Sequence, residues 1–409
     1  MNPLLKLLPS PSNEQMARLA TDALAARGFD RAKIRYEADD FQLRVDGNRI
    51  WLGNLQAQCR LVWPWQRAAV VRGFLDSVLD KPERPKTLEE ARPHLLPGAR
   101  DSFMFETLRL QSEAEGLPGH PPSGYALGSR LWLSAFLDYP DSTSVVTSTD
   151  LEAWGASSER CLELALSNLA AKSTHRLEPV ADGVYHSPWQ DCYDPARLLC
   201  RDVLASVQVK GDPVAFVPNW NHLFLTGSED LEGLAGALMI TMKIVEEEPR
   251  PMSALPLVRR GGCWVDFDLP RGHLLEPLLR KARVLELNQI YREQAALIER
   301  LHEKTGADVY VAKYNATRNE KDDQYDSYAV WSKDVVTLLP RSERVVFFDN
   351  ERPEQQKVVA EADWAIVALH CAPLMKDAGY TPTRYLVESF PTREQLEAMT
   401  AAQALRSAA

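Results

Sequence analysis

Two acidic side chains that alternate on a predicted strand are the first candidates for chemistry. Asp266 and Asp268 lie in Val265–Asp268, and a strand places alternate side chains on the same face. Two carboxylates placed in this way can share a proton or hold a cation. The same pattern is typical of a solvated strand face ahead of Pro270. We expect the solvated face and keep Asp266 and Asp268 as a candidate carboxylate pair.

A second group of candidates lies between His186 and Cys200. Asp191, Cys192 and Asp194 stand between them, so this short segment is rich in side chains that can bind metal. Their spacing fits no usual zinc pattern. Asp194 directly precedes a proline, which is typical of the start of a helix. We therefore predict no metal ion and no other cofactor.

Trp220 and His222 are candidates for contact with a partner. They lie in the turn between two predicted strands, Val214–Pro218 and Leu223–Leu225. The asparagines beside them are ordinary turn residues. Amphipathic aromatic side chains at a loop tip also suit a binding surface. We expect a packed turn, with a contact role for Trp220 and His222 as the alternative.

The familiar catalytic and phosphate-binding motifs are absent from the sequence. It contains no GxxxxGK[ST] loop, no GxGxxG after a predicted strand, and no HExxH, GxSxG or SxxK motif. His370 and Cys371 follow a predicted strand, Ile366–Leu369, and adjacent strand residues point to opposite faces, so they cannot form a thiol–imidazole pair. The charged segment Asn319–Asp326 lacks the glycine and final glutamate of an EF-hand loop, and we expect an acidic loop there.

Composition narrows the class of protein and of partner. The chain has 409 residues, enough for two or three domains, and a formal net charge of −10, which argues against a nucleic-acid partner. Its six cysteines are scattered without a CxxC pair, which indicates reduced thiols in the cytoplasm. No apolar run approaches the ~20 residues that span a bilayer, and Met1–Pro11 does not read as a signal peptide. We expect a cytoplasmic protein with no membrane partner.

Hydrophobic periodicity predicts helices that alternate with pairs of strands. Strands that come in hairpins favour an α+β fold, with helices packed on mixed or antiparallel sheets in two to three domains. Residues 101–111 and 364–369 are predicted as strands, residues 353–361 as a helix, and a helix of roughly 30 residues starts near Leu274. We predict three parts: an N-terminal helix with a β-meander and helix at 1–98, an α+β core at 99–269, and a C-terminal α+β domain led by the long helix at 270–409.

Several short segments carry a resemblance to a known family. They are Phe41–Val45, Trp51–Leu55, Thr149–Gly155, Leu162–Leu169, Val217–Asn219 and Leu223–Leu225. Through them, residues 33–268 resemble the YtpQ-like family of uncharacterised bacterial proteins. The most specific piece is Thr149–Gly155 together with Asn168 and Leu169. The resemblance implies an architecture and a bacterial, cytosolic setting but no activity, and residues 270–409 lie outside it.

Three functions are compatible with these observations. The first is a non-enzymatic factor that regulates or neutralises another protein by binding it, because no nucleophile–base or metal-ligand spacing is found. An acidic surface would then suit a basic partner. The second is an enzyme, hydrolase-like or metal-dependent, whose site is assembled only in three dimensions from residues such as Asp266, Asp268 and His186–Cys200. The third is a sensor of a small ligand in a cleft between two domains. We favour the non-enzymatic protein-binding factor.

Overall fold

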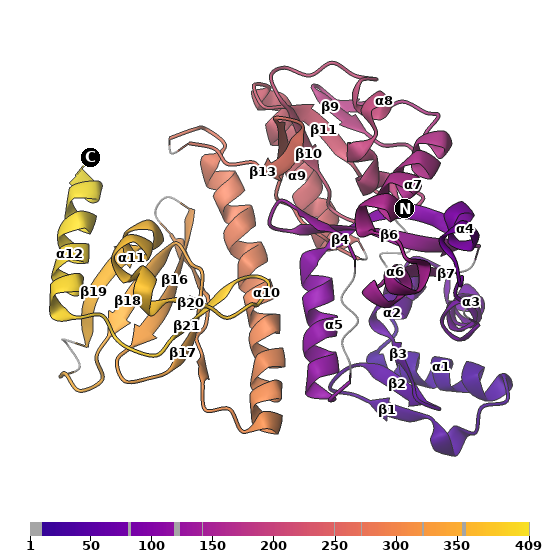
Figure 1. Ribbon diagram of the computed structural model, residues 1–409, viewed down its shortest axis with the longest axis horizontal. Coiled ribbons are helices and arrows are strands. Elements are labelled where there is room, and N and C mark those ends of the chain that lie inside the picture. The colour runs from indigo at the N-terminus through magenta and orange to yellow at the C-terminus, as the bar shows by residue number, and fades with distance from the viewer. Residues whose placement is uncertain are drawn as a thin grey trace.

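The chain folds into helices packed on five small sheets, so the predicted α+β fold is confirmed. The structure is a computed structural model and describes residues 10–80, 83–117, 123–140, 142–248, 250–270, 272–320, 323–353 and 357–408. Figure 1 shows a C-terminal lobe at one end, joined by one long helix to the rest of the chain. No helix within the described residues is long and apolar enough to cross a membrane.

The N-terminal part has its own hydrophobic core. Its first helix begins with a capping box, in which the Ser12 and Gln15 side chains bond each other's backbone N–H. Met16, Leu24 and Ile50 are completely or almost completely buried between the helices and an antiparallel β-meander. Its elements are α1 (Asn13–Ala26), β1 (Arg35–Glu37), β2 (Gln42–Val45), β3 (Asn48–Trp51), α2 (Gly53–Arg60) and α3 (Arg67–Leu79).

The central sheet follows, and one predicted strand there is wrong. Residues 101–111 belong to a helix, because the Asp101 side chain accepts a hydrogen bond from Phe103 N and caps its start. The strand lies just before it and pairs with β6 on both sides of the predicted boundary at residue 98, so these residues form one sheet. The elements are α4 (Leu88–Ala91), β4 (Leu95–Asp101), α5 (Ser102–Ala114), β5 (Tyr125–Leu127), β6 (Leu131–Tyr139), β7 (Ser142–Val145), α6 (Ser148–Trp154) and α7 (Ser158–Lys172).

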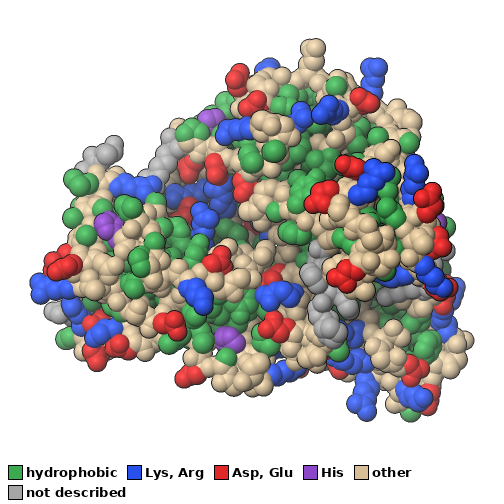
Figure 2. All heavy atoms as spheres, viewed as in Figure 1, with side chains coloured by type: hydrophobic (Ala, Val, Ile, Leu, Met, Phe, Trp, Pro, Cys, Tyr) green, Lys and Arg blue, Asp and Glu red, His purple; other side chains and the backbone are tan. Residues whose placement is uncertain are grey.

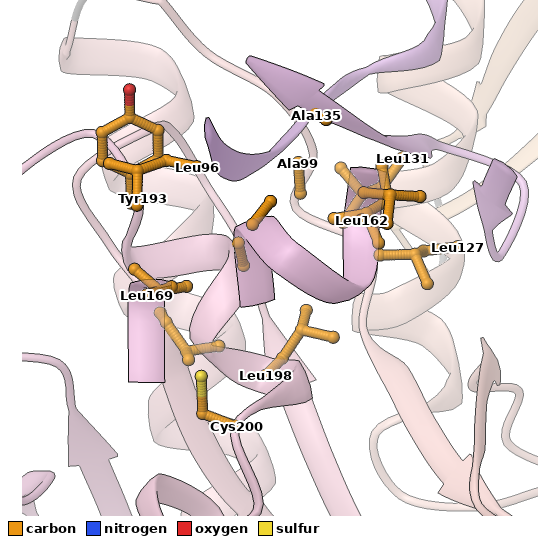
Figure 3. Packing of buried hydrophobic residues seen from close by; sticks show 14 of the residues in the cluster. Leu96, Ala99, Leu127, Leu131, Ala135, Leu162, Leu169, Tyr193, Leu198 and Cys200 are labelled. Atoms are coloured by element: carbon orange, nitrogen blue, oxygen red, sulfur yellow. The ribbon is translucent and has the colours of Figure 1, made fainter. Parts of the chain in front are cut away.

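The largest hydrophobic cluster lies between this sheet and α7. Figure 3 shows Leu162 and Leu169 of α7 packed with Leu131 of β6 and with Leu198 and Cys200 of the segment that follows. Each of these side chains is at least nine-tenths buried. Apolar burial, the main favourable contribution to folding, therefore holds α7 against this sheet.

An antiparallel six-stranded sheet packs beside the central sheet in the order β13-β12-β10-β11-β9-β8. The helix that covers it starts at a cap in which the Asp230 side chain accepts from Gly233 N. Val214, Phe216 and Leu238 are buried between that helix and the sheet. The elements are β8 (Glu178–Ala181), β9 (Val184–His186), α8 (Arg201–Leu204), β10 (Pro213–Phe216), β11 (Phe224–Gly227), α9 (Leu231–Glu247), β12 (Leu257–Arg260) and β13 (Cys263–Asp266).

The predicted long helix is α10 (Glu276–Thr305), and it ends at Gly306, whose φ of 75° suits a glycine. Two four-stranded sheets of the C-terminal lobe follow it, each with one parallel pair. Their elements are β14 (Tyr310–Val311), β15 (Asn315–Asn319), β16 (Gln324–Ser332), β17 (Thr337–Pro340), β18 (Arg344–Phe348), β19 (Val358–Asp363), α11 (Trp364–Cys371), β20 (Lys376–Asp377), β21 (Arg384–Val387) and α12 (Arg393–Ala408).

Two further predictions are wrong in this lobe. Residues 364–369 form a helix, α11, and not a strand. A helix was predicted at 353–361, but residues 358–361 belong to the strand β19. Residues 354–356 lie outside the described part of the chain. Both errors have one cause, because a short apolar run cannot be assigned to helix or strand from periodicity alone.

The helix α10 connects the two halves of the molecule. It packs beside α5, where Leu110 and Ile298 share a cluster with Leu338 of the C-terminal lobe. On the side of the C-terminal lobe, Arg384 binds α10. Its guanidinium is completely buried and donates to Gln294 Oε1 at 2.6 Å and to the Tyr291 carbonyl at 3.1 Å. The middle of α10 is thus fixed between the two halves.

Candidate functional site

A large cleft opens where α10 meets both halves of the molecule. Its volume is about 1160 Å³, slightly above the range of about 300 to 1,000 Å³ that is usual for ligand pockets. One wall comes from α5 and the β5–β6 hairpin, the floor from α10, and the far wall from Arg341–Glu343 and Thr381–Thr383. Figure 2 shows a hollow beside the C-terminal lobe in which basic and acidic side chains gather. The cleft joins segments that are distant in the sequence.

Much of the cleft wall is apolar. Side chains from α5, β6, the segment before β12 and α10 contribute to it, and Val284 and Leu287 lie one turn apart on the same helical face. Such a wall can bury the hydrocarbon part of a ligand at about 25 cal/mol per Å² of apolar surface. The main apolar residues are Leu108, Leu131, Leu255, Val284, Leu287 and Pro382.

One end of the cleft is charged. A smaller hollow of about 300 Å³ shares Arg283, Glu343, Trp364 and Ala365 with the large cleft and adds Asp326. Burial, together with the neighbouring Asp326, raises the pKa of Glu343 to about 7. Burial also opposes ionisation of Asp326, but its hydrogen bond with Glu343 and the Arg344 guanidinium lower its pKa below the usual range. The pair therefore holds one proton near neutral pH.

Basic and backbone groups already engage both carboxylates. Glu343 Oε1 accepts from Arg280 Nε at 2.7 Å, and its Oε2 accepts from Ser327 N at 3.0 Å. Asp326 Oδ2 lies 2.6 Å from Arg344 Nε. A carboxylic acid with a pKa near 7 can act as a general acid or base. Here proton transfer to a substrate would first require one of these contacts to break.

Sequence patterns gave no reason to select Glu343, and Asp326 was considered only as the end of the charged segment Asn319–Asp326. The parallel pairing of β16 with β18 brings them together, because its register sets Tyr328 opposite Arg344. A parallel pair needs a long crossover, so its register cannot be inferred from turn chemistry. An acidic residue near the start of each strand was the only signal in the sequence.

The candidate pair Asp266 and Asp268 lies at the rim of this cleft, with both side chains exposed. The buried Phe267 separates them, as the predicted alternation requires. Each carboxylate has its own partner: Asp266 Oδ1 accepts from Ser129 N at 2.8 Å, and Asp268 forms an ion pair with Arg283. The two carboxylates therefore act separately, as fixed charges at the cleft entrance.

His222 lies in a second polar cluster. It includes His186, which belongs to the strand β9 of the six-stranded sheet. His222 Nδ1 is 2.7 Å from His186 Nε2, and His222 Nε2 is 3.1 Å from Glu248 Oε2. Asn219 Nδ2 donates to the same carboxylate oxygen at 2.9 Å. Burial, and then the neighbouring His222, lower the pKa of His186 to about 4. The cluster forms a carboxylate–imidazole–imidazole chain with a neutral His186 at pH 7.

Trp220 is half-buried and packs in a stack of rings and guanidinium groups. The Arg100 guanidinium carbon lies 4.6 Å from the Phe136 ring centre and 4.0 Å from the Trp220 ring, and Arg250 lies 4.5 Å from Trp220. Gly98 leaves room for this stack, since a Cβ there would lie 2.7 Å from the Phe136 ring. Burial lowers the pKa of Arg100 to about 10. Cation–π contacts thus hold the turn in place.

The His186–Cys200 segment is a packed loop. Asp191 forms a bidentate ion pair with the fully buried Arg197, at 2.7 Å for both nitrogens. Cys192 N donates to Asn221 Oδ1 at 3.1 Å, which ties the loop to the turn that carries Trp220. In the described part of the chain, no three His, Cys, Asp or Glu side chains are grouped so that they could hold a metal ion. Asp194 opens a 3₁₀-helix, Asp194–Leu199.

The remaining thiols are all free. Cys371 is buried and lies 3.7 Å from the Met399 sulfur, while His370 precedes it on α11. On a helix, adjacent residues point about 100° apart, so the conclusion that these two side chains do not pair stands although the predicted strand was wrong.

Comparisons of the chain with protein-family models, curated proteins and solved structures find no match.

Proposed function

We propose that this protein binds a small organic molecule in the cleft beside α10. The observation that carries the proposal is the cleft itself, which combines a volume of about 1160 Å³ with an apolar wall and a charged end. Ligand sites in proteins are typically concave and mostly apolar, with few polar groups that fix orientation. This is the interdomain sensor that the sequence left open, and the resemblance to YtpQ-like proteins, proposed on sequence segments alone, adds no activity to it.

The shape and charge of the cleft suggest the kind of molecule. The apolar wall, with the partly exposed Leu255 and Leu287, suits an aromatic or aliphatic body. Arg341 lies at the far wall, and among the described residues its guanidinium has no carboxylate partner. A ligand with an apolar body and an acidic or strongly polar end would use both features.

Binding is favoured over catalysis by the state of the carboxylates. Glu343 and Asp326 have raised and lowered pKa values, which is a pattern of catalytic pairs. Their oxygens, however, accept hydrogen bonds from Arg280, Ser327 and Arg344. Structural ion-pair networks shift pKa values in the same way. We therefore propose that the pair supplies polar groups that orient the ligand at the charged end of the cleft.

The test uses anilinonaphthalenesulfonate, an apolar anion that fluoresces when it leaves water. Ala365 is exposed and lines the cleft, so the indole of A365W would take up part of the cleft without disturbing a core. Ala170 is exposed on α7 away from the cleft, and A170W is the matched control. We expect saturable binding at one site by the wild type and A170W, and at least about tenfold weaker binding by A365W. Equal binding by A365W would contradict the proposal.

Binding to another protein is the second candidate function. It was the function favoured from sequence, and one observation supports it: Trp65 is 73% exposed and stacks on Trp63 with ring centres 5.1 Å apart. Exposed aromatic pairs of this kind occur at protein interfaces. A regulatory or neutralising role in a bacterial cytoplasm would follow from such binding and is part of this second proposal.

A further inference from the structure

The Trp63–Trp65 pair lies in the turn between α2 and α3. Pro64 separates the two tryptophans, and a 3₁₀-helix, Pro64–Gln66, shapes the turn. The indole rings are nearly parallel, with 6° between their planes. Neither ring belongs to the hydrophobic cluster that forms the core of the N-terminal part. Core packing therefore does not explain these two side chains.

The turn holds the pair in a fixed arrangement. The Gln66 side chain accepts a hydrogen bond from Trp63 N at 3.0 Å, and Arg67 Nε donates to the Cys59 carbonyl at 3.2 Å, which ties the start of α3 to the end of α2. Proline at the first position of the short helix also fixes the backbone. A rigid aromatic surface loses little entropy when it binds.

The charge around the pair is opposite to that of the whole chain. Residues 47–75 contain four arginines and no aspartate, glutamate or lysine, whereas the chain as a whole carries −10. Arg60 and Arg72, on α2 and α3, are exposed, and in the described part of the chain neither forms an ion pair with a carboxylate. The stretch of chain that carries Trp65 is thus aromatic and positively charged, and Asp76, the first carboxylate after it, is paired with Arg27.

We infer that this surface, defined by Arg60, Trp63, Trp65 and Arg72, docks an acidic segment of a partner protein. The inference rests on the second candidate function, binding to another protein. Tryptophan and arginine are enriched at protein interfaces, while lysine, glutamate and aspartate are depleted there, and residues 47–75 follow this pattern. The partner segment presents a proline, aliphatic or aromatic side chain to the Trp65 ring and carboxylates to the arginines.

Anionic lipid and single-stranded nucleic acid are also attracted to aromatic and basic side chains. The absence of lysine from residues 47–75 and the strongly negative charge of the rest of the chain favour a short protein segment over these extended polyanions. Both are included in the test as outcomes that would overturn the inference.

The experiment selects binders from a displayed library of random peptides, using the full chain as bait. Selected peptides are then titrated against the wild type, W65A, R72E and L369A. Leu369 is 78% exposed on α11, so L369A removes an equally exposed apolar side chain elsewhere and is the matched control. Circular dichroism verifies that all four proteins are folded.

The expected peptides combine aspartate or glutamate with proline, aliphatic or aromatic residues. Their binding should weaken at least about tenfold in W65A and several-fold in R72E, remain unchanged in L369A, and decrease as salt is added. Peptides that bind W65A as well as the wild type would overturn the inference and leave protein binding intact. A library without any binder would overturn both. Trp65-dependent binding to phosphatidylserine vesicles or oligo-dT, without acidic peptides, would also overturn it.

Discussion

Glu343 and Asp326 have pKa shifts of opposite sign although they are hydrogen-bonded neighbours. Burial and the charge of Asp326 keep Glu343 protonated to about pH 7, while Arg344 helps to keep Asp326 ionised. In the unfolded chain the glutamate would titrate near 4.5. Between these two pH values the folded protein binds more protons than the unfolded one, so the free energy of unfolding falls as pH rises.

E343Q should remove this dependence, because glutamine resembles the protonated acid and does not titrate. From pH 5 to pH 8 we expect the wild type to lose on the order of 2 kcal/mol more free energy of unfolding than E343Q. Urea denaturation at several pH values measures the difference. Parallel pH profiles for the two proteins would show that Glu343 titrates as it does in water.

His186 should have the opposite effect on stability. Its pKa is lowered from 6.5 to about 4 by burial and by His222. Between these two pH values His186 is therefore protonated in the unfolded chain and neutral in the folded one. The free energy of unfolding therefore falls as the pH decreases from 6.5 towards 4. H186Q keeps an amide donor for His222 and should reduce that loss by on the order of 2 kcal/mol. Urea denaturation between pH 6.5 and pH 4 measures the loss. An equal loss of free energy of unfolding in H186Q and the wild type would contradict this prediction.

At the scale of elements, Arg384 of β21 forms buried hydrogen bonds that fix the position of α10. Its guanidinium is completely buried, has no carboxylate among its hydrogen-bond partners, and donates to carbonyl and amide oxygens of Gln294, Tyr291, Ala312 and Leu338. Burial lowers its pKa to about 10, so the group stays charged at pH 7. These bonds attach α10 to the sheet β14-β17-β21-β20.

R384A would remove the guanidinium donor from these buried oxygens, of which the Leu338 carbonyl still accepts from Ala312 N. We expect a loss of about 3 to 5 kcal/mol in the free energy of unfolding, since each buried unsatisfied group costs on the order of 1 to 3 kcal/mol. R393A is the control, because Arg393 is 91% exposed and pairs only with Glu397 on the surface, and no measurable change is expected. Urea denaturation followed by circular dichroism compares the two. Equal stability of R384A and the wild type would show that α10 is held by other contacts.

Sequence patterns predicted the elements that carry strong local signals. The long helix that starts near Leu274 and the two strands on either side of the turn with Trp220 and His222 both follow from periodicity and turn residues. The short apolar stretch at α11 was misassigned because periodicity there is ambiguous. The helix α5 was missed because its cap, Asp101, is also the last residue of the strand β4.

The site was harder to predict than the fold, because its residues meet only through tertiary contacts. Asp266 and Asp268 were selected as a candidate pair from their spacing, and they line the cleft, but each carboxylate has its own partner. Glu343 and Asp326 depend on a parallel strand pair whose register no local signal encodes. His186 and His222 come together because β9 pairs with β11, which sets His186 opposite Phe224. The pairing of strands that are distant in the sequence thus determines which polar residues lie together.

At the scale of the whole molecule, the cleft exists because two halves with separate cores share one helix. Leu110 of α5, Ile298 of α10 and Leu338 of β17 close the lower part of the junction, while the part near Val284 and Leu287 stays open. Sites between domains are common places for ligands. We therefore propose the junction as the ligand site and the Trp63–Trp65 turn as a separate binding surface.

The most direct test is a crystal structure of the wild-type protein grown with anilinonaphthalenesulfonate. We predict the ring system against Leu255 and Leu287, with the sulfonate towards Arg341, and no dye in crystals of A365W. Dye bound elsewhere on the protein, with an empty cleft in the wild type, would contradict the claim that this cleft is a ligand site.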